Sequence, residues 1–254
     1  NTVYPLLGFD NMIFKDAFTA PKKIRNYISD ESAFEKIIDL YEEKGTDEKL
    51  FAFEVTMQNH GGYSKDTDDF RESVYLTDEL NQGIQVRAAE KYLTLIQKSD
   101  EAFKELVEYF EKQKEPTIIL MFGDHQPSDY ITNVILRELD LDRDESQDVY
   151  FDNYIVPYIM WSNYDMDTTQ VENISLNYLS GLLMEKAGIG LTGYQQFLKD
   201  MQAELPVITA NMVMEADGDR EPEKDVQSEW IENYNKLVYN HLCDKTGKLS
   251  GFFE

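Results

Sequence analysis

The apolar run Ile118–Phe122 and the residues that follow it constrain the fold of this chain more than any other segment. The run stops abruptly at Gly123 and is predicted to be a buried strand. Asp124 and His125 come next, and a carboxylate and an imidazole are ligands suited to a divalent cation. Residues 126–129 predict a turn that opens a helix. Because α/β proteins hold ligands at the carboxyl ends of strands, we predict a site at this corner.

The charge balance narrows the classes of partner. The 254 residues include 49 Asp and Glu but only 24 Lys and Arg, a formal net charge of −25. Binding to the phosphate backbone of nucleic acids is therefore disfavoured, as is docking on an anionic membrane surface. An anionic substrate requires a metal ion or a local basic pocket to overcome this field. With 42% hydrophobic residues, the chain is predicted to be globular with a substantial core.

Cysteine usage and hydropathy exclude further classes. Cys243 is the single cysteine, so a disulfide framework within the chain and a Cys-rich zinc site are both excluded, and we expect this thiol to be inert. The sequence contains no apolar run long enough to span a membrane and no signal-peptide pattern. Residues 3–10 look like the middle of a domain, so we expect the chain to be a fragment.

The pattern along the chain predicts strands alternating with helices. Strands are expected at residues 49–57, 117–122 and 154–161, the last at an edge because it contains Pro157. Helices are expected at residues 30–43, 86–114, 130–139, 173–187, 193–204 and 225–242. This alternation implies an α/β fold with a mainly parallel sheet and helices on both faces.

Two of the three histidines follow predicted core strands. His60 lies after residues 49–57, and His125 follows residues 117–122 together with Asp124. The coincidence favours one shared site, although each histidine alone is more simply explained as a loop residue. Asp124 is also compatible with a helix cap. His241 has no partner motif and is interpreted as a surface or packing residue.

Other candidates have simpler explanations. Two acidic clusters lack the twelve-residue calcium-loop pattern and are interpreted as solvated loops. Four tyrosines look exposed and would suit a carbohydrate ligand, although core packing also explains many of them. No serine or threonine stands at a strand end beside a base, so no nucleophile is identified. The acidic clusters are Asp66, Asp68 and Asp69, and Asp140, Asp142, Asp144 and Glu145; the tyrosines are Tyr63, Tyr75, Tyr130 and Tyr150.

Several segments, taken together, resemble the extracellular catalytic domain of the lipoteichoic acid synthase-like family, in the sulfatase branch of the alkaline phosphatase superfamily. The similarity lies in residues 3–10, in the His60 motif at 55–63, in the Asp-His motif at 119–125, in 156–163 and in 177–197. The resemblance implies an alkaline phosphatase/sulfatase-like fold that is truncated on its amino-terminal side. Residues 1–205 would be a partial catalytic domain, and residues 206–254 a helical extension packed on it.

The resemblance also implies roles for residues. Asp124 and His125 would bind a divalent metal, with Mn²⁺ favoured over Mg²⁺ or Ca²⁺. His60 would contact the phosphate or act as the acid for the departing alcohol. The family's threonine nucleophile belongs to the first half of the domain, so this chain lacks it and is expected to be inactive alone. The Cys-x-Pro-x-Arg element of formylglycine sulfatases is absent, since Asp244 follows Cys243.

The sequence is compatible with two functions. The first is the carboxyl-terminal part of a metal-dependent phospho- or sulfo-ester transferase or hydrolase at the outer face of a bacterial membrane. Its substrate would be a phosphodiester, a phospholipid headgroup or a sulfate ester, and membrane attachment would come only from missing amino-terminal helices. The second is a non-catalytic surface domain that binds a glycan or a polyanionic polymer. The sequence does not specify an oligomeric state.

Overall fold

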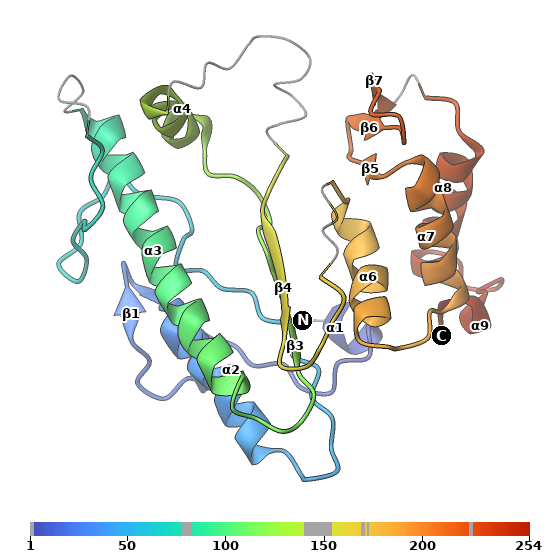
Figure 1. Ribbon diagram of the computed structural model, residues 1–254, viewed down its shortest axis with the longest axis horizontal. Helices are drawn as coiled ribbons and strands as arrows, with labels where there is room; N and C mark the ends of the chain where they lie inside the picture. Colours follow the sequence, from blue (N-terminus) through green and yellow to red (C-terminus); the bar gives the residue numbers. More distant parts are fainter. Residues whose placement is uncertain (1–2, 78–82, 140–153, 169–170, 172, 224–225) are drawn as a thin grey trace. The chain divides into compact units, whose positions relative to one another are not determined.

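The computed structural model describes the chain except for residues 1–2, 78–82, 140–153, 169–170, 172 and 224–225 (Figure 1). The chain divides into two compact units. Unit 1 comprises residues 1–115 and 125–145, and unit 2 comprises residues 116–124 and 146–254. The second acidic cluster and Tyr150 lie outside the described residues.

Unit 1 is mainly helical. Its principal helices are α2 (Asp30–Glu43), α3 (Ile84–Phe110) and α4 (Asp129–Glu138). The helix α2 begins where the sequence predicts, because Ser29 caps it by accepting a hydrogen bond from the Ser32 backbone N–H. The shorter elements of unit 1 are α1 (Val3–Leu6), η1 (Lys15–Ala17) and the hairpin strands β1 (Lys23–Ile24) and β2 (Tyr27–Ile28).

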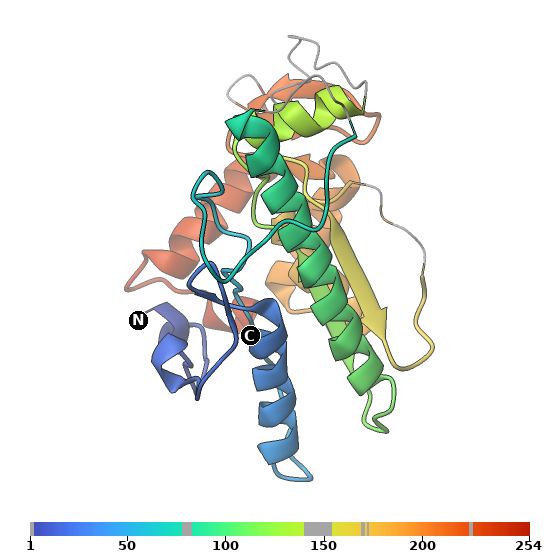
Figure 2. The same cartoon turned by 90° about the vertical axis from the view of Figure 1, so that its left-hand side faces the viewer.

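The core of unit 1 forms where two helices pack on α3. In Figure 2, α4 lies across the amino-terminal end of α3. Ile131 and Val134 of α4 are buried there against Ala88 and Ala89 of α3. The helix α2 packs along α3 as well, and the ring of Tyr41 meets that of Phe110 edge-on at a centroid distance of 5.2 Å. These contacts hold together the helices to which the loop containing His60 is attached.

Unit 2 combines a two-stranded ladder with helices and a small three-stranded sheet. The ladder pairs β3 with β4 in antiparallel register, with Phe122 opposite Tyr158. The three-stranded sheet has the order β5-β6-β7, and both of its pairings are antiparallel. The elements are β3 (Ile118–Phe122), β4 (Tyr158–Ser162), η2 (Leu176–Tyr178), α6 (Leu179–Lys186), α7 (Gly193–Glu204), β5 (Val207–Ile208), β6 (Met212–Met214), β7 (Arg220–Pro222), α8 (Glu229–Leu242) and α9 (Ser250–Phe253).

One hydrophobic cluster joins α7, the small sheet and α8. Met201 of α7 and Val213 of β6 are fully buried, and Leu205 and Ile231 complete the cluster. Residues on both sides of position 205 therefore share a core. The compact units thus follow a different division from residues 1–205 and 206–254, which stays a prediction about the catalytic domain and its extension.

The strand predictions need correction. Every strand pairing in the described part of the chain is antiparallel, so a mainly parallel sheet is not observed there. Residues 49–57 form no strand, and Phe51 and Val55 are 70% and 58% exposed. A core strand needs a hydrogen-bonding partner and a layer that covers its apolar face. The described residues supply neither to this segment.

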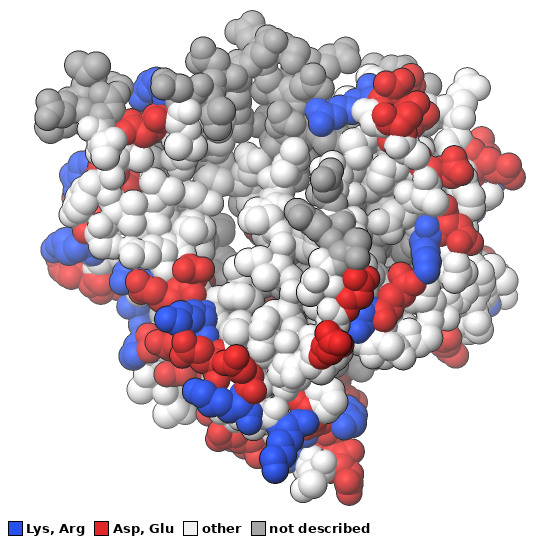
Figure 3. Space-filling model, in the orientation of Figure 1, with Lys and Arg blue, Asp and Glu red and all other residues white. Residues whose placement is uncertain are grey.

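Charged side chains are interleaved on the surface of unit 1. On the face shown in Figure 3, acidic and basic side chains alternate around the carboxyl-terminal end of α3. Glu115, for example, pairs with Lys44 at 2.7 Å and with Lys49 at 3.0 Å. None of the helices in the described part of the chain combines the length and apolar character needed to cross a lipid bilayer.

Candidate functional site

His60 lies in a loop that buried polar side chains fasten to two helices. Gln58 is 1% exposed, and its Oε1 accepts a hydrogen bond from the backbone N–H of Asp30 at the start of α2. Its Nε2 donates to Ser99 Oγ on α3 at 3.2 Å. Asn59 Nδ2 also donates to Ser99 Oγ, at 2.8 Å. The backbone before His60 is therefore fixed by side chains rather than by a strand ladder.

Arg25 holds the loop from its other side. The guanidinium donates to the backbone oxygens of His60 and Gly61 at 3.2 and 3.0 Å, and it stacks over the ring of Tyr63 at 4.9 Å. Arg25 and Asn26 both have positive φ values, as the two central residues of a type I′ hairpin turn do. This two-residue hairpin places Arg25, a positioning residue that the sequence analysis did not identify, in the interior of unit 1.

Tyr63 corrects one sequence-based expectation. Its side chain is 4% exposed, so it is a core residue and not an exposed aromatic. Burial raises the pKa of its phenol to about 12, with a smaller contribution from Tyr92. Its hydroxyl donates to the backbone oxygen of Asn59, which further fixes the loop. Tyr75 and Tyr130 are exposed, as expected.

The imidazole of His60 is exposed, although hydrogen bonds fix the backbone of its loop. The hydroxyl of Tyr27 lies 3.4 Å from Nδ1, and the two ring centroids are 5.9 Å apart. When the hydroxyl donates to Nδ1, the neutral ring carries its hydrogen on Nε2. His60 can then present an N–H to an oxygen of a substrate.

Asp124 and His125 follow β3, as predicted. The ladder extends one residue past β3, because the Gly123 N–H donates to the backbone oxygen of Pro157 at 3.1 Å. A Cβ at position 123 would lie 3.1 Å from the Cβ of Val156, a tight contact, so the close approach of the chain before β4 favours glycine here. Asp124 is the first residue beyond the ladder, and its side chain is exposed.

A backbone contact selects the tautomer of the neutral His125 ring. Its Nδ1 donates a hydrogen bond to the backbone oxygen of Gln126 at 2.7 Å. A carbonyl oxygen only accepts, so Nδ1 carries the hydrogen and Nε2 of the neutral ring keeps its lone pair. Histidines that bind metals commonly show this arrangement. The donor set of Asp124 and His125 therefore fits a divalent cation.

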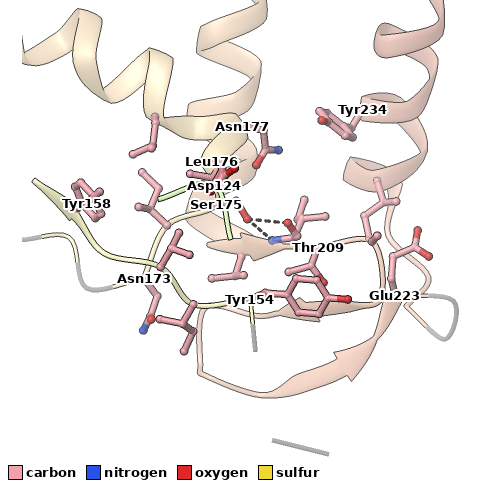
Figure 4. Close-up of a pocket in the computed structure, with 18 of the residues that line it drawn as sticks. Asp124, Tyr154, Tyr158, Asn173, Ser175, Leu176, Asn177, Thr209, Glu223 and Tyr234 are labelled. Carbon is pink, nitrogen blue, oxygen red and sulfur yellow. Dashed lines mark hydrogen bonds between the residues drawn. The ribbon is translucent and has the colours of Figure 1, made fainter. Parts of the chain in front are cut away.

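The structure assigns these residues to different units. His60 and His125 belong to unit 1, whereas Asp124 belongs to unit 2, where it lines a cavity of about 620 Å³ (Figure 4). Within the described residues, no group of three or more His, Cys, Asp or Glu side chains forms a complete metal site. A metal held by Asp124 and His125 thus needs further ligands, as the resemblance to the family implies.

The remaining candidates have structural explanations. Asp66 pairs with the buried Lys91 at 2.6 Å and with Arg87 at 3.1 Å, so it is ion-paired rather than simply solvated. His241 is exposed and stacks on Phe253 at 4.3 Å, which confirms the surface or packing interpretation. Cys243 is an exposed free thiol.

Comparison with known proteins gives a family match. Residues 1–189, which include His60, Asp124 and His125, match the Sulfatase family model. A putative cyclic β-1,2-glucan modification protein of Rhizobium meliloti (strain 1021) is 25% identical over 265 residues, covering 99% of this chain and 40% of that protein. The capsular polysaccharide biosynthesis protein RkpI of the same organism is 27% identical over 124 residues, 48% of this chain and 20% of that protein.

A solved structure shares the fold. The Streptococcus pyogenes phosphoglycerol transferase GacH, in complex with sn-glycerol-1-phosphate, aligns with a TM-score of 0.68 and 18% sequence identity. The alignment covers all of this chain and 60% of that one. The chain spans about two fifths of the length of the cyclic glucan modification protein.

Proposed function

Because this chain belongs to the sulfatase family, we propose that it is part of a metal-dependent enzyme that transfers glycerol phosphate to a bacterial surface polysaccharide. The membership confirms the resemblance seen in the sequence. Three names support transfer of glycerol phosphate to a polysaccharide: a fold neighbour is a phosphoglycerol transferase, and two relatives are named for a glucan and a capsular polysaccharide. The alternative reaction is hydrolysis of a phosphate or sulfate ester.

The observation that carries the proposal is the hydrogen bond from His125 to Gln126. It gives His125 the tautomer with a lone pair on Nε2, directly after the carboxylate of Asp124. We propose that both bind a divalent metal, with Mn²⁺ first and Mg²⁺ or Ca²⁺ as alternatives. When bound, such an ion neutralises charge on phosphate oxygens and lowers the pKa of a coordinated hydroxyl. It would also offset the repulsion between the substrate and a chain of charge −25.

His60 is proposed to act on the departing oxygen. With Tyr27 donating to Nδ1, the neutral ring donates a hydrogen bond from Nε2–H to that oxygen. To give it a proton, His60 must be the imidazolium, in which Nδ1–H donates to the Tyr27 hydroxyl instead. Arg25 and Gln58 fix the backbone on either side, so the loop that carries the imidazole is held in place without help from the substrate. Both are positioning residues.

The overall reaction balances as an exchange of alcohols on phosphorus. The oxygen of an acceptor hydroxyl forms the new bond to phosphorus, and the bond from phosphorus to the donor's oxygen breaks. The acceptor proton ends on the released donor alcohol. We propose that the transfer passes through a covalent enzyme intermediate. The nucleophile that forms it lies in a part of the full-length protein outside this chain. The chain alone is then inactive, and a lipid headgroup such as phosphatidylglycerol serves as the donor.

Metal binding tests the proposed site directly. We expect Mn²⁺ to bind this chain in 0.2 M NaCl, as shown by loss of the electron paramagnetic resonance signal of free Mn²⁺. Asp124→Asn should weaken binding at least tenfold, whereas Asp100→Asn, an exposed carboxylate on α3, should not. Equal Mn²⁺ binding by both variants would show diffuse binding to an acidic surface and would remove the metal site.

Turnover is tested in the full-length protein. Phosphatidylglycerol labelled in its headgroup and a β-1,2-linked glucose trisaccharide should give a phosphoglycerol-modified sugar. His60→Ala should lower the rate roughly 10²–10⁴-fold, the range for a lost general acid. A protein that releases sulfate from sulfate esters and transfers no glycerol phosphate would refute the transferase proposal. Robust turnover by this chain alone would refute the claim that its nucleophile lies elsewhere.

A further inference from the structure

Unit 2 contains a ligand-sized pocket whose lining includes Asp124. Its volume of about 620 Å³ lies in the range of small-molecule sites, about 300–1,000 Å³. Figure 4 shows the wall built from three places in the chain: the segment around β4, the loop and turn at residues 173–177, and the β5–β6 turn with α8. Thr209 belongs to the β5–β6 turn, Glu223 directly follows β7, and Tyr234 belongs to α8. These three residues lie beyond residue 189, where the family match ends.

Internal hydrogen bonds hold this pocket in shape. Ser175 is 6% exposed, and its Oγ both accepts from the Ile208 N–H at 2.6 Å and donates to the Ile208 carbonyl at 2.9 Å. Tyr178 is buried, and its hydroxyl donates to the backbone oxygen of Leu205 at 2.9 Å. The Ser175 bonds tie the 173–177 segment to β5, and the Tyr178 bond ties the end of η2 to the end of α7. The pocket is therefore preformed, which reduces the entropy lost when a ligand binds.

The lining is a mixture of apolar surface, aromatic rings and neutral hydrogen-bonding groups. Amides and hydroxyls can both donate to and accept from a ligand hydroxyl, and the two carboxylates accept from it. The carboxylates also repel an anion, so the pocket disfavours a phosphate group. The tyrosine rings offer flat apolar surfaces. The amides are Asn173, Asn177 and Asn235, the carboxylates are Asp124 and Glu223, and the rings are Tyr154, Tyr158 and Tyr234.

We propose that this pocket binds the acceptor: a neutral, polyhydroxylated ligand, namely one or two sugar units of a polysaccharide. Asp124 carries the argument, because it lines the pocket and is also half of the proposed metal motif. A sugar held here would present a hydroxyl beside the residue that binds the metal. The role of this sugar as the acceptor rests on the proposed transferase function. Binding of a neutral sugar in the pocket does not depend on that function.

Binding without turnover provides the first test. The probe is the β-1,2-linked glucose trisaccharide, added to this chain without metal and followed by saturation-transfer NMR. We expect binding, with Asn177→Ala and Glu223→Gln each weakening it at least fivefold. Glu221→Gln, an exposed carboxylate on β7 outside the lining, is the matched control and should bind as the wild type does. Thermal unfolding of each variant confirms that it is folded.

Three outcomes would overturn the assignment. They are absence of trisaccharide binding, binding that ignores both lining variants, and displacement of the trisaccharide by sn-glycerol-1-phosphate at equal concentration. The last would identify the pocket as a donor site.

The full-length enzyme separates this assignment from the proposed reaction. In the transfer assay, Glu223→Gln should raise the KM for the trisaccharide at least fivefold, and Glu221→Gln should not. Transfer with an unchanged KM would refute the pocket assignment while leaving the transferase intact. Sugar binding that depends on Asn177 and Glu223 in a protein without transfer activity would support the pocket and refute the reaction. It would instead identify a glycan-binding domain.

Discussion

At the scale of single residues, the His60 loop shows how buried polar groups replace a strand ladder. Asp30 is 2% exposed at the first turn of α2, and its Oδ2 accepts a hydrogen bond from Ser99 Oγ at 2.5 Å. Ser99 also accepts from Gln58 and Asn59, so one hydroxyl joins α2, α3 and the loop. Networks of this kind are stabilising only while every member keeps its partners.

Asp30 should make the stability of the protein depend on pH. Burial raises the pKa of its carboxyl above the ordinary value of 3.8, an effect that hydrogen bonds from Ser99 and Thr56 partly offset. The folded state then holds the proton more tightly than the unfolded state. Its contribution to stability is complete below pH 3.8 and is lost as the pH rises through the folded-state pKa. We predict that Asp30→Asn becomes progressively more stable, relative to the wild type, as the pH rises across this range.

Urea unfolding at several pH values checks the effect of Asp30. Glu43→Gln, which removes an exposed carboxylate on the same helix, is the control. A constant difference between Asp30→Asn and the wild type at every pH would mean that the carboxyl of Asp30 is not perturbed. The pKa of the Glu54 carboxyl is also raised, first through loss of hydration and then through the charge of Asp30, so this pKa should fall in the Asp30→Asn variant.

At the scale of elements, the sequence predicts helices well where their end signals are local. The predicted bounds 30–43 and 193–204 match α2 and α7, because Ser29 and the Thr192–Gln195 capping box are visible in the sequence. The predicted helix at 173–187 is instead a 3₁₀ turn followed by the shorter α6. The helix predicted at residues 225–242 is α8, which begins at Glu229 because Ser228 caps it.

Strands depend on distant partners, and here the sequence predicts less. Residues 118–122 form the expected strand, but residues 49–57 do not, because no described segment pairs with them. The sheet β5-β6-β7 was not predicted, since its strands have only two or three residues and are held by contacts with α7 and α8. In the candidate site, Asp124 and His125 were predicted from one motif. Arg25 and the pocket were not, because they depend on a hairpin turn and on segments far apart in the sequence.

The link between β3 and Asp124 can be tested at Gly123. A methyl group there would lie 3.1 Å from Cβ and 3.4 Å from Cγ1 of Val156, a tight contact that requires Val156 to shift. We predict that Gly123→Ala lowers the stability of unit 2 by about 1–3 kcal/mol, the usual cost of overpacking. It should also weaken Mn²⁺ binding, because Asp124 is the next residue along the chain.

Gly190→Ala is the matched control for this substitution. A Cβ at position 190 meets nothing within 4 Å, so this variant should unfold like the wild type and bind Mn²⁺ equally well. Thermal unfolding and the Mn²⁺ titration on the same samples measure both effects. If Gly123→Ala unfolds like the control, Val156 does not constrain the end of the ladder.

At the scale of the whole molecule, the formal charge of −25 sets the electrostatic conditions for folding and for the proposed chemistry. Exposed ion pairs such as Lys104–Glu108 contribute little, typically about 0–1 kcal/mol. Mutual repulsion among the surplus carboxylates acts over longer distances and opposes the compact state. A cation held at Asp124 and His125 would lower this repulsion locally as well as serve the proposed chemistry.

Because salt screens the repulsion among the surplus carboxylates, we predict that salt stabilises this protein. The screening length is about 10 Å at 0.1 M ionic strength and about 3 Å at 1 M, so distant repulsions fade while contact pairs at 2.7–3.0 Å weaken less. We expect the midpoint of thermal unfolding at pH 7 to rise by several degrees between 0.05 and 0.5 M NaCl. The rise should be smaller at pH 5, where partial protonation of the carboxylates reduces the net charge. A midpoint that falls with salt at pH 7 would mean that ion pairs such as Lys91–Asp66 outweigh the repulsion, and the charge of the whole chain would then matter less than its local pairing.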